Sequence, residues 1–163
     1  MRIEFMKKTD AGSVLPKLYR ILYDNMSSIT PMGNSYEEDL SEWLSCVKPA
    51  LQKEPRQILL LRDKDKMIGF FQYYVNNGVF MMEEIQFLEE YQGTGIFGEL
   101  YRYLVSMIPA DTKFVEAYAH KNNARSIAIL THLGLRPVEE GREDLLHFRG
   151  DYLKLIEKYG TNI

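Results

Sequence analysis

A glycine-rich turn between an apolar, strand-like segment and an amphipathic helix is the part of the chain best suited to chemistry. The turn has the pattern Gly93-x-Gly95-x-x-Gly98 and follows the apolar residues around Ile85–Leu88. Backbone N–H groups and the helix dipole attract an anion at the start of a helix, and glycine lets a phosphate approach the main chain. The pattern therefore indicates a ligand that carries phosphate, although a plain strand–helix turn would also use these glycines.

Three kinds of phosphate-binding loop combine a strand, a glycine turn and a helix, and the spacing selects among them. A P-loop needs Lys and then Ser or Thr after its last glycine, but Glu99 and Leu100 follow Gly98. The dinucleotide fingerprint places its glycines directly at the end of an early strand. Here Glu89–Tyr91 intervenes, and the 65 residues after Gly98 are too few for the rest of a doubly wound array. The third option is a loop for the pyrophosphate of coenzyme A.

Two blocks of the sequence resemble the GNAT superfamily of N-acetyltransferases, and together they cover about residues 79–135. Gln92–Phe97 (QGTGIF) is similar to the family's Q/R-x-x-G-x-G/A loop. Asn123–Leu135 (NARSIAILTHLGL) is similar to its N-x-x-A/S-x-x-x-Y-x-x-x-G-F segment, at the expected distance downstream. The chain departs from the pattern at Phe97, where the family has Gly or Ala. It departs again at Leu130, where many members have a tyrosine that acts as a general acid.

The resemblance implies that acetyl-CoA is bound by the strand, the loop and the second block. In the family, the strand before the loop holds the pantetheine arm through backbone hydrogen bonds, and the loop backbone holds the pyrophosphate. The asparagine that matches Asn123 contacts the cofactor, while its simpler role is to cap the helix that it opens. The expected cofactor-binding residues are Ile85, Gln86, Phe87, Gln92, Gly93, Thr94, Gly95, Ile96, Phe97, Gly98 and Asn123.

Acetylation of an amine needs a base that removes a proton from the ammonium group. Glu83 and Glu84 lie on the strand before the loop, and alternation puts them on opposite faces. Several family members place their base four residues before the last pantetheine-binding position, and this offset from Phe87 favours Glu83 over Glu84. Solvated or paired carboxylates are the alternative for both.

The departing thiolate also needs a proton, and the thioester oxygen needs a hydrogen-bond donor. Because Leu130 cannot supply the proton, Tyr118 or water is the expected source. The expected donor to the oxygen is a strand N–H near Phe87 or Leu88. Three dispersed histidines and a single cysteine predict no metal site.

The acceptor is hardly specified by the sequence. Family members use the first two helices and their loop as the acceptor wall, and here this region contains the acidic residues Glu37, Glu38, Asp39 and Glu42. An acidic rim would attract an amine, but the same run is equally the capped, solvated start of a helix.

The elements that must position these residues follow from hydrophobic periodicity and from turn residues. Strands are predicted at Arg2–Lys8, Gln57–Arg62, Met67–Val75, Val79–Leu88, Lys113–Ala119 and from Leu135, and helices at Asp10–Ile29, from Ser35 to before Pro55, at Gly95–Ile108 and at Asn123–Leu133. Ser35-x-x-Glu38 has the pattern of a capping box. For Asp144–Glu157 we favour an irregular segment and a last strand near Asp151–Ile156 over a short helix. This order of elements matches the family, so the resemblance implies an α/β fold with a mixed, mostly antiparallel central sheet flanked by helices.

Composition sets the remaining limits. A chain of 163 residues is predicted to form one domain over residues 1–163. A net charge of −3 argues against nucleic acid as a partner, and no apolar run approaches the roughly 18 residues that would span a membrane. Cys46 is the one cysteine, so an internal disulfide is excluded, as suits a cytoplasmic protein. These features leave a homodimer open.

The sequence therefore predicts an acetyl-CoA-dependent N-acetyltransferase that transfers the acetyl group directly to a primary amine of a small molecule, peptide or protein. The alternative is a non-catalytic acyl-CoA-binding sensor or interaction module. Leu130 is the feature that favours this alternative, because the family's usual proton donor is missing there.

Overall fold

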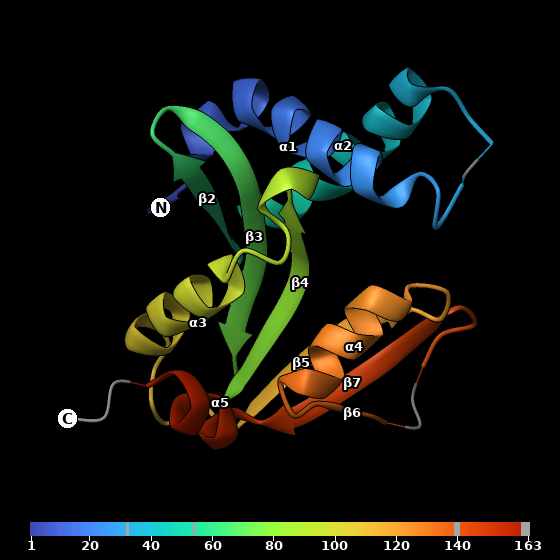
Figure 1. Ribbon diagram of the computed structural model, residues 1–163. Coiled ribbons are helices and arrows are strands. Elements are labelled where there is room, and N and C mark those ends of the chain that lie inside the picture. The colour runs from blue at the N-terminus through green and yellow to red at the C-terminus, as the bar shows by residue number, and fades with distance from the viewer. Residues whose placement is uncertain (32, 54, 139–140, 161–163) are drawn as a thin grey trace. The chain divides into compact units, whose positions relative to one another are not determined.

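The fold is built on a mixed, mostly antiparallel sheet of seven strands in the order β1-β2-β3-β4-β5-β7-β6 (Figure 1). The computed structural model describes residues 1–31, 33–53, 55–138 and 141–160. Its strands are β1 Arg2–Phe5, β2 Gln57–Asp63, β3 Lys66–Asn76, β4 Val79–Phe87, β5 Phe114–His120, β6 Arg136–Pro137 and β7 Leu145–Asp151. Its α-helices are α1 Ala11–Met26, α2 Tyr36–Gln52, α3 Ile96–Met107, α4 Ala124–His132 and α5 Tyr152–Tyr159, and two short 3-10 turns are η1 Lys8–Asp10 and η2 Glu89–Tyr91. The predicted fold class is confirmed.

The prediction for the C-terminal elements is wrong. The last strand, β7, lies earlier than expected and pairs antiparallel with β5 from Phe114↔Asp151 to His120↔Leu145. The segment expected as a strand begins the helix α5, in which Tyr152 and Leu155 are buried. A spacing of three residues brings two side chains to one face of a helix but to opposite faces of a strand. The helical alternative therefore matches the observed burial.

One compact unit consists of Met1–Gln72 and Glu84–Gln92. In it α1 and α2 lie side by side (Figure 1). The predicted cap of α2 is present, because the Oγ of Ser35 accepts a hydrogen bond from the backbone N of Glu38 at 3.2 Å. The core of this unit contains Met6, Leu15, Leu18, Val47, Leu51, Ile58, Leu60 and Phe70.

The other compact unit consists of Tyr73–Glu83 and the described residues from Gly93 onwards. Here α3 and α5 are neighbours, and α4 lies against β5 (Figure 1). Tyr101 of α3 stacks on Tyr159 of α5 with ring centroids 5.4 Å apart, and burial raises the pKa of Tyr101. Phe80 of β4 meets Tyr152 edge to face at 6.2 Å, and burial raises the pKa of Tyr152 to about 12. Packed aromatic rings therefore tie both helices into this unit.

Among the described residues, no helix has the length and apolar character needed to cross a membrane.

Candidate active site

The glycine loop before α3 has a backbone that glycine alone adopts readily. Gly93 and Gly95 have φ angles of 78° and 82°, in the left-handed region. A Cβ built on either residue would meet no heavy atom of the described chain within 4 Å. Gly98 differs, because it lies in the first turn of α3 without a positive φ, and its Cβ would meet the flexible end of Arg102 at 3.3 Å. The first two glycines of the pattern are thus required by the backbone, whereas the third is not.

The N-terminus of α3 is suited to an anion. Its N-cap residue, Gly95, has no side chain to accept a hydrogen bond from the first turn. The backbone N of Gly98 donates to the carbonyl of Gly95 at 3.1 Å, so the turn closes directly on the loop. The positive end of the helix dipole and the open space beside Gly93 and Gly95 lie in the same loop. A phosphate is the kind of group that such a loop accommodates.

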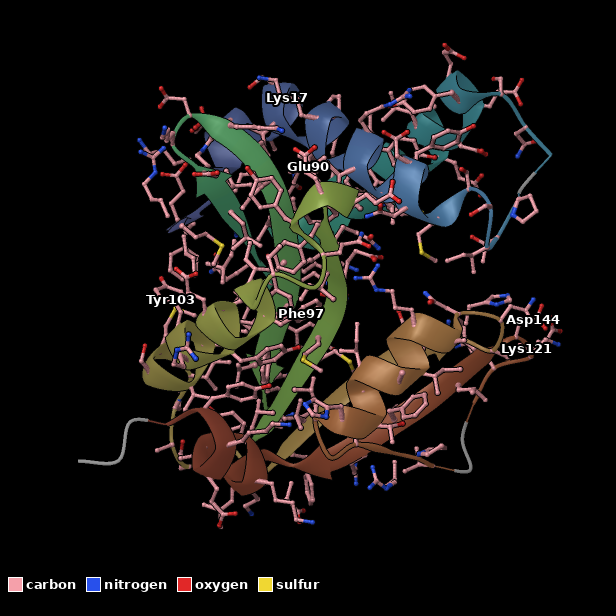
Figure 2. All side chains as sticks on the ribbon, viewed as in Figure 1. Lys17, Glu90, Phe97, Tyr103, Lys121 and Asp144 are labelled. Carbon is pink, nitrogen blue, oxygen red and sulfur yellow. The ribbon has the colours of Figure 1, made fainter. Side chains whose placement is uncertain are left out.

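Phe97, where the family pattern has Gly or Ala, belongs to the packing of α3 (Figure 2). Its ring stacks on that of Tyr101 with centroids 6.2 Å apart and planes 11° apart. Since Tyr101 stacks in turn on Tyr159, this departure extends an aromatic column within the unit. The large side chain therefore has a structural role in the first turn of the helix.

The acidic linker between β4 and the loop forms η2, which is anchored to the β2–β3 turn. The hydroxyl of Tyr91 donates to Asp63 at 2.7 Å, and this hydrogen bond raises the pKa of Tyr91. Lys66 pairs with Glu90, which raises the pKa of the lysine, and Glu90 is labelled in Figure 2. These two contacts thus hold η2, which connects β4 to the glycine loop, against the turn between β2 and β3.

A network of amide side chains surrounds the end of β4. The Nδ2 of Asn25, on α1, donates to the Oε1 of Gln86 at 2.9 Å and to the carbonyl of Phe87 at 2.8 Å. The Nε2 of Gln92 donates to the same carbonyl at 3.1 Å, and the Nε2 of Gln86 donates to Glu84 at 2.6 Å. These bonds fix the backbone of the segment expected to hold pantetheine. The side chains of Gln86 and Gln92 therefore serve this network.

Asn25 contributes to this network although it is not among the residues predicted from the sequence. It occupies a position three residues after Leu22, on the stripe that includes the buried Leu15 and Leu18. A polar residue at the spacing of an apolar stripe is the signal that could have identified it, because an amide that is partly buried there needs hydrogen-bond partners.

Gly69 explains how closely β3 approaches the end of β4. A Cβ at this position would clash with the carbonyl oxygen of Gln86 and lie 2.8 Å from the ring of Phe87. Here the absence of a side chain, and not an unusual φ, is what the structure requires.

The two candidate bases lie on opposite faces of β4, as predicted from alternation. Met82 accepts a hydrogen bond at its sulfur from the hydroxyl of Tyr101 at 3.3 Å, so the Met82 face is the one that packs on α3. Glu83 points to the other face and is half-buried. Glu84 shares a face with Gln86, whose amide it binds at 2.6 Å. Glu84 is therefore engaged in the amide network, whereas Glu83 lies on the opposite face of β4.

Glu83 lies just past the end of the parallel ladder between β4 and β5. The register pairs Met81 with Glu116 and Met82 with Ala117, and it ends there. The next residue on each strand is Glu83 on β4 and Tyr118 on β5. Paired residues of neighbouring strands point to the same face of the sheet, and successive residues alternate between the faces. Glu83 and Tyr118 each follow a residue of the last pair, so both lie on the face opposite α3. Tyr118 is 42% exposed.

Tyr118 belongs to a cluster that we call the Glu116 cluster, consisting of Glu116, Tyr118, His147 and Arg149. The rings of Tyr118 and His147 stack at 4.5 Å, with planes 10° apart. The Oε1 of Glu116 accepts from the Nε of Arg149 at 3.0 Å. It also lies 3.0 Å from the Nε2 of His147, at ion-pair distance but outside hydrogen-bond geometry. All four residues face the same side of the β5–β7 ladder.

His147 and Arg149 are not predicted as site residues, because the last strand is expected near Asp151–Ile156 and β7 lies earlier in the chain. Their ladder is closed at its far end by Lys121 and Asp144, which pair at 2.7 Å and lie next to each other in Figure 2. The side-chain hydrogen bond and the charge of Lys121 lower the pKa of the Asp144 carboxyl group, and the backbone N of Lys121 also donates to the carbonyl of Asp144 at 2.8 Å. The contacts between Lys121 and Asp144 thus help to hold β5 and β7 in register.

The structure also shows the surroundings of Asn123, Leu130 and Leu88, for which the sequence predicts roles or losses of role. Asn123 is buried and caps α4, because its Oδ1 accepts from the backbone N of Ser126 at 3.1 Å. Leu130 is buried at 7% exposure and fills the core side of α4. The N–H of Leu88 donates to the carbonyl of Ile68 at 2.8 Å, so Leu88 is wrong as a donor to the thioester oxygen.

Replacing Asn123 with Ala is expected to lower the free energy of unfolding by about 1 kcal/mol, because α4 loses its cap. Urea denaturation measures the change. Asn122→Ala is the matched control, since the side chain of this neighbouring asparagine is exposed and it is the backbone N–H of Asn122 that donates to His120. An equal loss in both variants would contradict the capping role.

A family model described as the acetyltransferase (GNAT) family matches residues 15–135 of the chain. A comparison with curated proteins finds no match. Among solved structures, the PaiA N-acetyltransferase from Thermoplasma acidophilum in complex with coenzyme A is 13% identical with a TM-score of 0.71, covering 93% of this chain and 100% of that one.

The names of two other similar structures state the acceptor of the enzyme. A variant of the spermidine N-acetyltransferase from Vibrio cholerae is 12% identical with a TM-score of 0.65, covering 96% of each chain. The ribosomal-protein-S18-alanine N-acetyltransferase from Escherichia coli is 20% identical with a TM-score of 0.60, covering 92% of each. At these identities the likeness shows the fold, while the family model matches well over half of the sequence. The chain therefore belongs to the acetyltransferase (GNAT) family.

Proposed function

We propose that this protein is an acetyl-CoA-dependent N-acetyltransferase that transfers the acetyl group directly to a primary amine. The observation that carries the proposal is the pair of left-handed glycines, Gly93 and Gly95, at the uncapped N-terminus of α3. The family match and a structural neighbour that was crystallised with coenzyme A support it. We propose further that residues 1–163 act as one domain of the family.

The residues present fit the coenzyme. The pyrophosphate would lie on the backbone of Gly93–Gly98, where a Cβ at Gly93 or Gly95 would meet open space. Pantetheine would run along Ile85–Phe87, whose end is fixed by the bonds from Asn25 and Gln92 to the carbonyl of Phe87. Asn123, at the start of α4, would contact the coenzyme in addition to capping its helix.

In this proposal Glu83 is the general base. When bound, acetyl-CoA supplies an activated acetyl group as a thioester. Glu83 takes a proton from the acceptor's ammonium group, directly or through water, and so frees the nitrogen lone pair for attack. Its place on the face of β4 opposite α3 supports the role. Leu130 has no proton to give, so water or the hydroxyl of Tyr118 would protonate the departing thiolate.

The acceptor is a primary amine of a small molecule, peptide or protein. Structural neighbours are described as acting on spermidine and on an alanine of ribosomal protein S18. These acceptors differ in size and kind, so the shared fold does not select one.

Saturating acetyl-CoA is expected to raise the melting temperature. At a concentration 100 times its dissociation constant, a ligand that binds only the folded state adds about 2.7 kcal/mol of stability, or about 5 to 10 °C for a chain of this size. Thermal unfolding with acetyl-CoA, coenzyme A and NAD measures this. An equal rise with NAD, and none with coenzyme A, would contradict the proposed ligand.

Leu130 favours a second candidate, a non-catalytic module that binds acyl-CoA, because the family's proton donor is absent from this buried position. Thiol release from acetyl-CoA, measured with a broad panel of amines, separates the two candidates. Release with any amine supports the enzyme. Coenzyme A binding without release from any amine supports the module.

A further inference from the structure

We propose that the ring of Tyr118 is a binding platform for the acceptor, which is an alkylammonium compound without a carboxylate beside its amine. This inference rests on the proposed function and adds a substrate class and a specificity-determining residue to it. It is carried by the position of Tyr118 beside Glu83 and by the side chains that hold its ring.

Tyr118 and Glu83 are the first residues of β5 and β4 beyond the paired register, which ends at Met82↔Ala117. Met82 and Ala117 are 5% and 4% exposed on the face toward α3, so the alternation turns Glu83 and Tyr118 to the opposite face. A carboxylate and an aromatic ring are thus presented together where the two strands stop pairing.

The Tyr118 ring lies flat on His147, with centroids 4.5 Å apart and planes 10° apart. The side chains of His147 and Glu116 are only 13% and 9% exposed, and the Nε2 of His147 lies 3.0 Å from the Oε1 of Glu116. Arg149 holds the same oxygen at 3.0 Å. The exposed ring of Tyr118 is therefore held in place by His147 on one side. Because the ring is already ordered, a ligand that binds its other side costs less side-chain entropy.

The face of a tyrosine ring attracts a cation within about 6 Å of its centroid, and a carboxylate adds a full negative charge beside it. An ammonium group at the end of an alkyl chain suits both the ring and the carboxylate. The methylene groups of the chain would cover the ring of Tyr118, while Glu83 would receive the proton of the ammonium group. The acceptor would reach the base through the same contact that recognises it.

Arg149 is the cation of the Glu116 cluster, and it is already bound to Glu116 and lies 4.6 Å from the ring of Phe114. A carboxylate next to the acceptor amine would compete with Glu116 for Arg149 and would be repelled by Glu83. An amine without that carboxylate is therefore the better acceptor.

Steady-state thiol release tests the substrate class with n-pentylamine and norleucine, which share an alkyl chain and differ by the α-carboxylate. We expect kcat/KM to be at least tenfold higher for n-pentylamine. Tyr118→Leu should raise the KM for n-pentylamine about fivefold to tenfold, whereas Tyr118→Phe keeps the ring and should change it less than threefold. Tyr103→Leu, on α3, is the matched control and should leave this KM unchanged. An unchanged KM for n-pentylamine in Tyr118→Leu would overturn the platform, as would an equal rise of this KM in Tyr118→Leu and Tyr118→Phe. A preference for norleucine would overturn the substrate class.

Nuclear magnetic resonance with ring-labelled tyrosine tests the platform without turnover. The signal of Tyr118 is identified by its loss in Tyr118→Phe, and n-pentylamine is titrated with n-pentanol as the uncharged control. We expect n-pentylamine alone to shift this signal in protein saturated with coenzyme A. No shift, or an equal shift with n-pentanol, would overturn the platform even if coenzyme A binds. Failure of coenzyme A to raise the melting temperature would count separately against the proposed function.

Discussion

Replacing Glu83 with Gln is expected to lower kcat about 100-fold or more, because glutamine cannot take the proton from the ammonium group. The substitution keeps the size of the side chain and its half-buried place on β4. The dissociation constant of acetyl-CoA should stay within about twofold, since the proposed cofactor contacts lie elsewhere. Thiol release under saturating acetyl-CoA measures kcat, and calorimetry measures binding.

Glu84→Gln is the matched control one residue away. Glu84 accepts a hydrogen bond from Gln86 at 2.6 Å, and a glutamine there retains an oxygen that can accept it. We expect its kcat to fall less than about threefold. Unchanged turnover in Glu83→Gln together with a large loss in Glu84→Gln would show that the base lies on the other face of the strand.

The features that the sequence predicts well depend on neighbours in the chain. Gly93 and Gly95 can be read directly, because left-handed backbone in a short turn needs glycine whatever surrounds it. The cap at Ser35 and the opposite facing of Glu83 and Glu84 depend likewise on offsets of a few residues. Local geometry also explains why Gly98, inside the first turn of α3, is dispensable for the loop's conformation.

The features that it misses depend on contacts between distant segments. Asn25 binds a carbonyl 62 residues away, and Glu116 binds Arg149 33 residues away. Such pairs follow from the register between elements, which a single sequence does not contain. The apolar spacing of Tyr152 and Leu155 did carry a helical signal, but the β-branched and aromatic residues nearby competed with it. Placing the last strand too late then hid His147 and Arg149 from the site.

Replacing Gly95 with Glu is expected to abolish the rise in melting temperature with coenzyme A. The change places a side chain and a negative charge at the N-cap of α3, where the pyrophosphate would lie. It also forces a residue with a Cβ into a φ of 82°, which costs about 1 to 2 kcal/mol of stability by itself. Thermal unfolding of the variant with and without coenzyme A separates the two effects, because strain lowers both melting temperatures and only the lost site removes their difference.

Two control variants make the result specific to the loop. Gly12→Glu places the same charge in the first turn of α1, where a Cβ also meets open space, and it should keep the full shift with coenzyme A. Gly95→Ala introduces the strain without the charge or the bulk, so it should lower the starting melting temperature and retain most of the shift. If Gly95→Glu retains the full shift as well, the phosphate does not lie at this helix N-terminus, and the glycines serve only the turn between β4 and α3.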